Sequence, residues 1–104
     1  LYVDDMARAS VQIMNMDKKI YNDQISPMSS HINIGSGSDL TIKDLAKIIQ
    51  EVVGYQGEIN FDPTKPDGIP RKLLNSERLN NFNFKTIVKL KEGLIKTYED
   101  YLNI

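Results

Sequence analysis

The charged side chains of one proline-rich segment are the best candidates for binding a ligand. The segment reads Lys65-Pro66-Asp67-Gly68-Ile69-Pro70-Arg71-Lys72 and holds three cations and one carboxylate. Prolines restrict its backbone, and a stiff loop loses less conformational freedom when it binds. Arg and Lys side chains can engage phosphate oxygens, and a carboxylate can accept hydrogen bonds from sugar hydroxyls. From composition alone, however, a solvated connecting loop is the more common case, so a binding loop and a plain connector both stay open.

Other polar clusters give weaker indications of chemistry. Gly35-Ser36-Gly37 could open a phosphate-binding turn, but the dinucleotide motif needs a third glycine where this chain has Leu40. A plain strand-to-helix turn is therefore expected there. His31 begins a predicted strand and is expected to be an ordinary surface residue, and Asp4 with Asp5 is explained by helix capping and the helix dipole. We predict neither a catalytic residue nor a metal site in this chain.

The elements that must position these residues follow from hydrophobic spacing and end signals. Helical spacing predicts helices over about 6–14, 42–53, 76–82 and 90–102. The second of these begins at a capping box, a hydroxyl followed three residues later by an acid, and stops at a glycine. These four segments account for the expected three to four helices.

Alternating apolar residues predict short strands at 31–34 and 57–62, with a strand end at 1–3. Residues 18–30 show no sustained period and are expected to form a surface loop. The predicted fold class is α/β, a small mixed domain of three to four helices with two or three short strands.

Composition limits the partners and the class of protein. The chain has 104 residues, 13 basic against 14 acidic, a net charge of −1, a sequence pI of about 5.8 and no cysteine. This length suits one domain, 1–104, with one compact core. The balanced charge predicts neither a nucleic-acid nor a membrane partner, and with no long apolar stretch or leader the expected location is cytoplasmic. The opening Leu1-Tyr2-Val3 lacks an initiator Met, so a longer protein is expected.

The order of several motifs adds a resemblance that no single motif gives. The motifs are LYVDDMA (1–7), SHINIGSG (30–37), TIKDLA (41–46), FDPTKPDGIPRKLL (61–74) and KEGL (91–94). Together they resemble the C-terminal portion of the extended short-chain dehydrogenase/reductase family, also called the NAD-dependent epimerase/dehydratase family. The KPDG-x-PRKLL run is similar to the branch that epimerises and reduces GDP-4-keto-6-deoxy-D-mannose.

The resemblance implies a two-part enzyme. An N-terminal Rossmann domain would bind NADP and carry the catalytic residues, and this chain, with the Rossmann part absent, would be the C-terminal domain that binds the GDP-sugar substrate. It implies Asp67 and Lys72 as substrate-binding residues, with Arg71 either assisting or bracing the loop. It also implies epimerisation at two carbons beside a ketone, then hydride transfer from NADPH, in a homodimeric parent. Another nucleotide-sugar epimerase or dehydratase, or a non-catalytic interaction module, are the alternatives.

Several positions depart from the family pattern, among them Phe82-Asn83-Phe84, where Leu-Gly-Trp is usual. Ile69 and Asn75 replace a threonine and an aspartate, which puts substrate contact at those two positions in doubt. Asn83 stands where glycine is usual and must adopt a left-handed conformation, while Phe84 must fill the space of a tryptophan. Lys89 replaces a serine that would cap the last helix.

Overall fold

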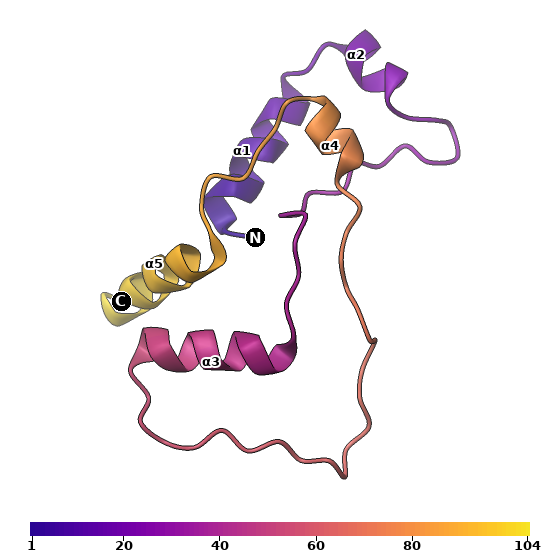
Figure 1. Cartoon of the computed structure of the whole chain (residues 1–104). Helices are drawn as coiled ribbons and strands as arrows, with labels where there is room; N and C mark the ends of the chain where they lie inside the picture. Colours follow the sequence, from indigo (N-terminus) through magenta and orange to yellow (C-terminus); the bar gives the residue numbers. More distant parts are fainter.

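The computed structural model describes residues 1–104 as five helices joined by long irregular segments (Figure 1). The helices are α1 (Val3–Met14), α2 (Lys18–Asp23), α3 (Ile42–Val53), α4 (Glu77–Asn81) and α5 (Leu90–Leu102). Helices α1 and α4 lie near each other, α3 packs against α5, and residues 54–76 make a wide excursion between α3 and α4. The arrangement is open rather than layered.

The ends of α3 follow the predicted signals. The hydroxyl of Thr41 accepts a hydrogen bond from the Asp44 backbone N–H at 3.0 Å, which satisfies one of the free donors of the first turn. Gly54 ends the helix with φ of 70°, a left-handed conformation that glycine adopts at little cost. The predicted bounds of this helix are confirmed, as are those of α5.

The predicted strands are wrong. Residues 31–34 and 57–62 form no ladder, and the one β-bridge of the chain joins Ser26 to Ser29 within a turn. Alternation of apolar residues decides which side chains share a face, but a strand also needs a second backbone about 4.8 Å away to complete its hydrogen bonds. Neither segment has such a neighbour, so the strand half of the α/β prediction fails. Residues 1–3 likewise contain no strand end, because α1 already begins at Val3.

The region predicted as a loop, 18–30, contains α2. The Asp17 carboxylate accepts hydrogen bonds from the backbone N–H groups of Lys19 at 2.8 Å and Ile20 at 3.4 Å. This local cap supports a six-residue helix that has no apolar stripe to reveal it. The chain therefore has five helices instead of three to four.

The hydrophobic core is small and lies between α1, α4 and the segments beside them. Its members are Ala9, Leu79 and Phe84, with Ile13, Ile32 and Ile34 packed against them. Only 7 of 104 residues are buried, and the radius of gyration is 17.5 Å, against about 13 Å for a compact chain of this length. The expected compact core is thus not found, because much of the apolar surface faces outward.

A second set of contacts joins α5 to the start of the chain and to α3. A Cβ added to Gly93 would lie 3.1 Å from the Tyr2 ring, so the close approach of these two residues leaves little room for a larger side chain. Lys91 on α5 donates to Glu51 on α3 at 2.7 Å. None of the helices has the length and apolar character needed to cross a membrane.

Three of the departures from the family pattern behave as expected. Asn83 has φ of 57°, and Phe84 is 3% exposed in the core, with the Arg8 guanidinium 5.2 Å above its ring. Lys89 precedes α5 and makes no side-chain cap bond. The substitutions at 83 and 84 are therefore accommodated, while the start of α5 is left uncapped.

Candidate functional site

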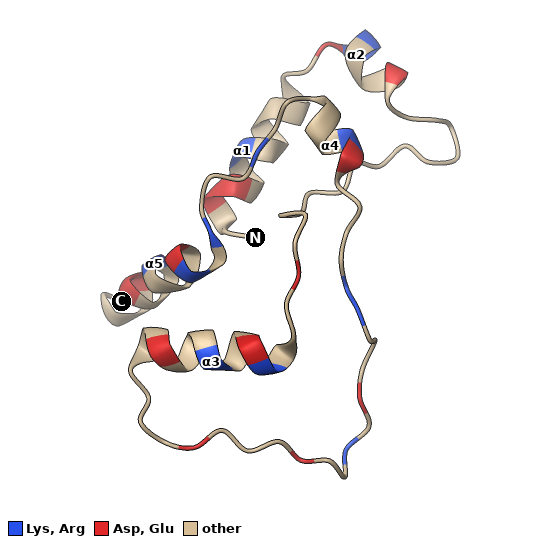
Figure 2. Cartoon of the chain, in the orientation of Figure 1, with Lys and Arg blue, Asp and Glu red and all other residues tan.

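The proline-rich loop, residues 61–74, is fully exposed and carries charges of both signs along its length (Figure 2). Near its start, the Asp62 carboxylate accepts from the Thr64 N–H at 2.9 Å and the Thr64 hydroxyl at 2.6 Å, which fixes a local turn. These two hydrogen bonds lower the pKa of Asp62. Asp67 and Lys72 make no hydrogen bond or ion pair with the rest of the chain. Both groups are free to meet a ligand.

Arg71 is held by an acid that the sequence did not indicate. Its Nε and Nη2 atoms donate to the two carboxylate oxygens of Asp39 at 2.5 and 3.1 Å. The hydrogen bond and charge of Arg71 lower the pKa of Asp39, and Asp39 in turn raises the pKa of Arg71. This ion pair braces the loop against the segment before α3, and a role of Arg71 in substrate binding stays a prediction.

Two further contacts fasten the end of the loop to the segment before α3. The Asn33 amide donates to the Asn75 carbonyl oxygen at 3.2 Å. A Cβ on Gly35 would lie 2.9 Å from the Ser76 Oγ and 3.3 Å from the Leu74 Cβ, so this backbone approaches too closely for most side chains. The predicted turn at Gly35 therefore also serves as a seat for the end of the loop.

The cap of α4 differs from the prediction. Ser76 occupies the N-cap position, but its hydroxyl is buried without a hydrogen-bond partner. The neighbouring Asn75 side chain instead accepts from the Glu77 N–H at 2.9 Å. Asn75 thus has a structural task here, in keeping with the doubt about its contact with a substrate.

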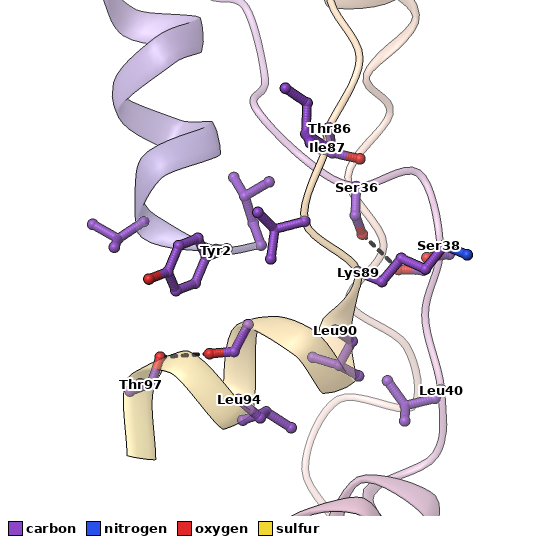
Figure 3. Close-up of a pocket in the computed structure, with 14 residues that line it drawn as sticks. Tyr2, Ser36, Ser38, Leu40, Thr86, Ile87, Lys89, Leu90, Leu94 and Thr97 are labelled. Atoms are coloured by element: carbon purple, nitrogen blue, oxygen red, sulfur yellow. Dashed lines mark hydrogen bonds between the residues drawn. The ribbon is translucent and has the colours of Figure 1, made fainter. Parts of the chain in front are cut away.

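A cavity of about 730 Å³ opens between the start of the chain, residues 36–40 and residues 86–97 (Figure 3). Most of its lining is apolar: the Tyr2 ring lies over α5, and Leu40 lies on the side facing Leu90 and Leu94. This groove is open and lacks a charged cluster, so it offers contact area rather than reactive groups.

A second cavity of about 320 Å³ is lined only by polar residues, namely Ser29, His31, Asn33, Asn75, Glu77 and Arg78. The Arg78 guanidinium donates to the carbonyl oxygens of Ser29 and His31 at 2.6 and 2.8 Å, and to the Ser29 hydroxyl at 2.9 Å. His31 takes part through its backbone carbonyl oxygen, which accepts from Arg78. The Arg78 guanidinium, the strongest donor of this cavity, already binds the segment at Ser29 and His31. The cavity therefore has a structural explanation.

The structure does not gather the predicted binding residues into either cavity. Asp67, Arg71 and Lys72 line neither of them, and the three form no contact with one another by hydrogen bond or ion pair. They share only the exposed loop. The pairing of Asp39 with Arg71 could not be predicted from the sequence, because the two residues lie 32 positions apart and Asp39 belongs to no periodic pattern.

Asp5 also has a different role from the one predicted. The N-cap of α1 is Tyr2, without a side-chain cap bond, and Asp5 is only 1% exposed. Its carboxylate accepts from the N–H groups of Ile87 at 3.0 Å and Val88 at 3.0 Å, and from Arg8 at 2.6 Å. Burial raises its pKa, but these donors outweigh burial and the pKa is lowered. Asp5 joins α1 to the segment that leads into α5.

The chain's own residues do not fit a dinucleotide cofactor. Gly37 has φ of 77°, but several residues separate it from α3, and Thr41 already satisfies a donor of the first turn of that helix. A pyrophosphate would need a glycine-rich turn leading directly into the helix. No three His, Asp or Glu side chains gather in a way that could hold a metal ion.

Comparison with known proteins gives a consistent result. No protein-family model matches the chain. It is 46% identical to the GDP-L-fucose synthase of Escherichia coli (strain K12) over 102 residues. This alignment covers 98% of this chain and 32% of that enzyme. It is 45% identical to the probable GDP-L-fucose synthase 1 of Oryza sativa subsp. japonica, over 98% of this chain and 28% of the relative.

A solved structure agrees with the sequence relatives. The GDP-mannoheptose C4 reductase from Campylobacter jejuni, with NADP bound, matches 95% of this chain and 29% of its own at a TM-score of 0.77 and 33% identity. The chain spans about a third of the length of the curated relatives, in their C-terminal part. The similarity to the C-terminal portion of this branch is therefore confirmed.

Proposed function

We propose that the chain is the C-terminal, substrate-binding part of a GDP-L-fucose synthase, which converts GDP-4-keto-6-deoxy-D-mannose to GDP-L-fucose with NADPH. The observation that carries the proposal is the 46% identity over 98% of this chain, a span that includes the loop at 61–74. A GDP-sugar reductase with the same local fold supports the same substrate class. The alternative of an unrelated interaction module has no comparable observation behind it.

In this enzyme the chain binds and orients substrate instead of supplying reacting groups. The free ammonium of Lys72 pairs with the GDP diphosphate, and the Asp67 carboxylate accepts from sugar hydroxyls. Contacts to the nucleotide, remote from the reacting carbons, hold the keto sugar in the geometry that the reaction needs. The residues of this chain do not fit NADPH, so the cofactor binds elsewhere in the enzyme. When bound there, it supplies the hydride.

The enzyme's own N-terminal Rossmann domain is the partner that we assign to this chain, in a cytoplasmic homodimer. The curated relatives are about three times as long as this chain, and large apolar side chains are exposed along its open groove. Exposed apolar surface of this extent is typical of an interface.

The full-length enzyme provides the test. Purified protein is incubated with GDP-4-keto-6-deoxy-D-mannose and NADPH, NADPH oxidation is followed by absorbance, and the product is analysed by NMR. We expect NADPH consumption and a product inverted at both carbons that flank the ketone. Reduction without inversion would replace the proposal with a simple C4 reductase, and a lack of both turnover and GDP-sugar binding would overturn it.

A further inference from the structure

The ion pair between Asp39 and Arg71, called here the latch, is the first polar contact that the long excursion after α3 makes with the rest of the chain beyond Gly57. The Gln50 amide donates to the Gly57 carbonyl at 2.7 Å near the start of the excursion. From there to Arg71 every hydrogen bond stays within the loop itself. The latch is therefore the first of the contacts that fix the second half of the loop, ahead of those at Leu74, Asn75 and Ser76.

The latch uses the geometry that gives arginine its directional binding. Two guanidinium nitrogens meet two carboxylate oxygens, a forked contact that fixes orientation as well as distance. The side chain of Arg71 is 67% exposed and that of Asp39 is 34% exposed. Ion pairs this exposed contribute little to global stability, so the effect of the latch is local.

Lys72 follows Arg71 directly and has no partner of its own. Its position in space therefore depends on the backbone that the latch holds on one side and the contacts of residues 74–76 hold on the other. Displacement of a binding group by about 1 Å can weaken productive binding by up to about 100-fold. The latch can thus influence the site without touching the substrate.

We propose that Asp39 is a positioning residue for the GDP-sugar site, which holds Arg71 so that the following Lys72 is presented to the diphosphate. The proposal rests on the proposed function and deepens it. It assigns Arg71 to bracing and leaves Lys72 as the direct phosphate ligand.

The sign of the effect separates this role from a direct role of Arg71. Asp39→Asn removes a negative charge near a site for an anion. If Arg71 were the ligand and Asp39 merely competed for it, the substitution would free Arg71 and lower KM. If Asp39 positions the loop, the same substitution raises KM although the site has become more positive.

The experiment uses the full-length enzyme, with steady-state kinetics on the GDP-keto sugar and calorimetry with GDP. For Asp39→Asn we expect KM and the Kd of GDP to rise roughly tenfold, with kcat and Tm nearly unchanged. The control is Asp23→Asn, which breaks an exposed Lys19–Asp23 ion pair on α2, and should change none of these values. The double variant with Arg71→Ala should be no worse than Arg71→Ala alone, because Asp39 acts through Arg71.

Each other outcome contradicts the proposal. Equal KM values in Asp39→Asn and Asp23→Asn, a lower KM, a large loss of Tm, or additive effects in the double variant would overturn the positioning role while turnover by the unmodified enzyme keeps the proposed function intact. No turnover by the unmodified enzyme would overturn both.

Discussion

Lys72 is the residue whose loss should affect substrate binding most directly. We expect Lys72→Ala in the full-length enzyme to raise KM by roughly 10- to 100-fold with less effect on kcat, because a charge-assisted contact to both substrate and transition state is removed. Steady-state kinetics with the GDP-keto sugar measures the change. Lys43→Ala, which removes an exposed cation from α3, is the matched control. If Lys72→Ala and Asp67→Ala both match that control, the loop is only a solvated connector.

Asp5 is a residue whose substitution should affect stability. Asp5→Asn replaces an acceptor of three donors by an amide whose NH₂ group meets N–H groups, so we expect a loss of about 2–3 kcal/mol in the free energy of unfolding. Urea unfolding followed by circular dichroism gives the value. Asp4→Asn, at the exposed neighbouring position, should leave stability nearly unchanged. Equal stabilities of the two variants would show that the buried carboxylate contributes nothing.

The contribution of Asp5 should also depend on pH. Despite burial, the hydrogen bonds from Val88, Ile87 and Arg8 hold its pKa in the folded protein below the ordinary value of an aspartate, about 3.9, so the folded state favours the carboxylate. The stabilisation is therefore complete above that value and is lost as pH falls through it toward the folded pKa. The difference in stability between the unmodified protein and Asp5→Asn should shrink in this range. A difference that stays constant from neutral pH to about pH 2 would contradict the assignment.

At this scale the local backbone conformation of Asn83 could be predicted from the sequence, but the partners of Asp5 and Arg71 could not. The motif at 61–74 pointed to Asp67, Arg71 and Lys72, and the left-handed position of Asn83 followed from the chemistry of the residue that it replaces. The partners of Asp5 and Arg71 lie 82 and 32 residues away, and no local spacing encodes such distances. Whether Asp67 and Lys72 bind substrate stays a prediction.

Among the elements, α3 and α5 differ in how they begin. Thr41 and Lys89 have nearly the same backbone angles, φ of −70° in both and ψ of 154° and 157°, but only Thr41 provides a side-chain cap. Because the backbone already has the required geometry, Lys89→Ser should cap α5 and stabilise the protein by about 0.5–1 kcal/mol. Urea unfolding of the full-length enzyme measures the gain. A decrease, or no change while Thr41→Ala destabilises, would show that the α5 start is held by other contacts.

Elements determined by neighbouring residues were predictable, and those determined by distant backbone were not. The ends of α3 depend on Thr41, Asp44 and Gly54, all readable from the sequence. A strand depends on hydrogen bonds to a second backbone. The alternation at 31–34 places Ile32 and Ile34 on one face, but no neighbouring backbone pairs with this segment, so no strand forms. Helix α2 escaped prediction for the opposite reason, since its single Asp17 cap acts without any apolar period.

The whole molecule is too open to bury its own apolar surface. Its principal extents are 53 × 36 × 20 Å, and exposed side chains include Met14 at 83% and Ile42 at 75%. We therefore expect the isolated chain to bind a hydrophobic dye and to self-associate as its concentration rises, because exposed apolar patches seek cover. Analytical ultracentrifugation measures the association, and the full-length enzyme at the same concentrations is the control. A monodisperse monomer with a radius of gyration near 13 Å, by X-ray scattering, would contradict the open arrangement.

The span between Asp5 and its donors also sets an order of events during synthesis. A ribosome releases the chain from its N-terminus, so the Asp5 carboxylate emerges long before Ile87 and Val88, 82 and 83 residues later. Until then it stays hydrated, and α1 cannot be fixed against the segment before α5. This part of the fold is therefore completed only after residues 87 and 88 have left the ribosome, which makes a nascent chain stalled before residue 87 a target for chaperones.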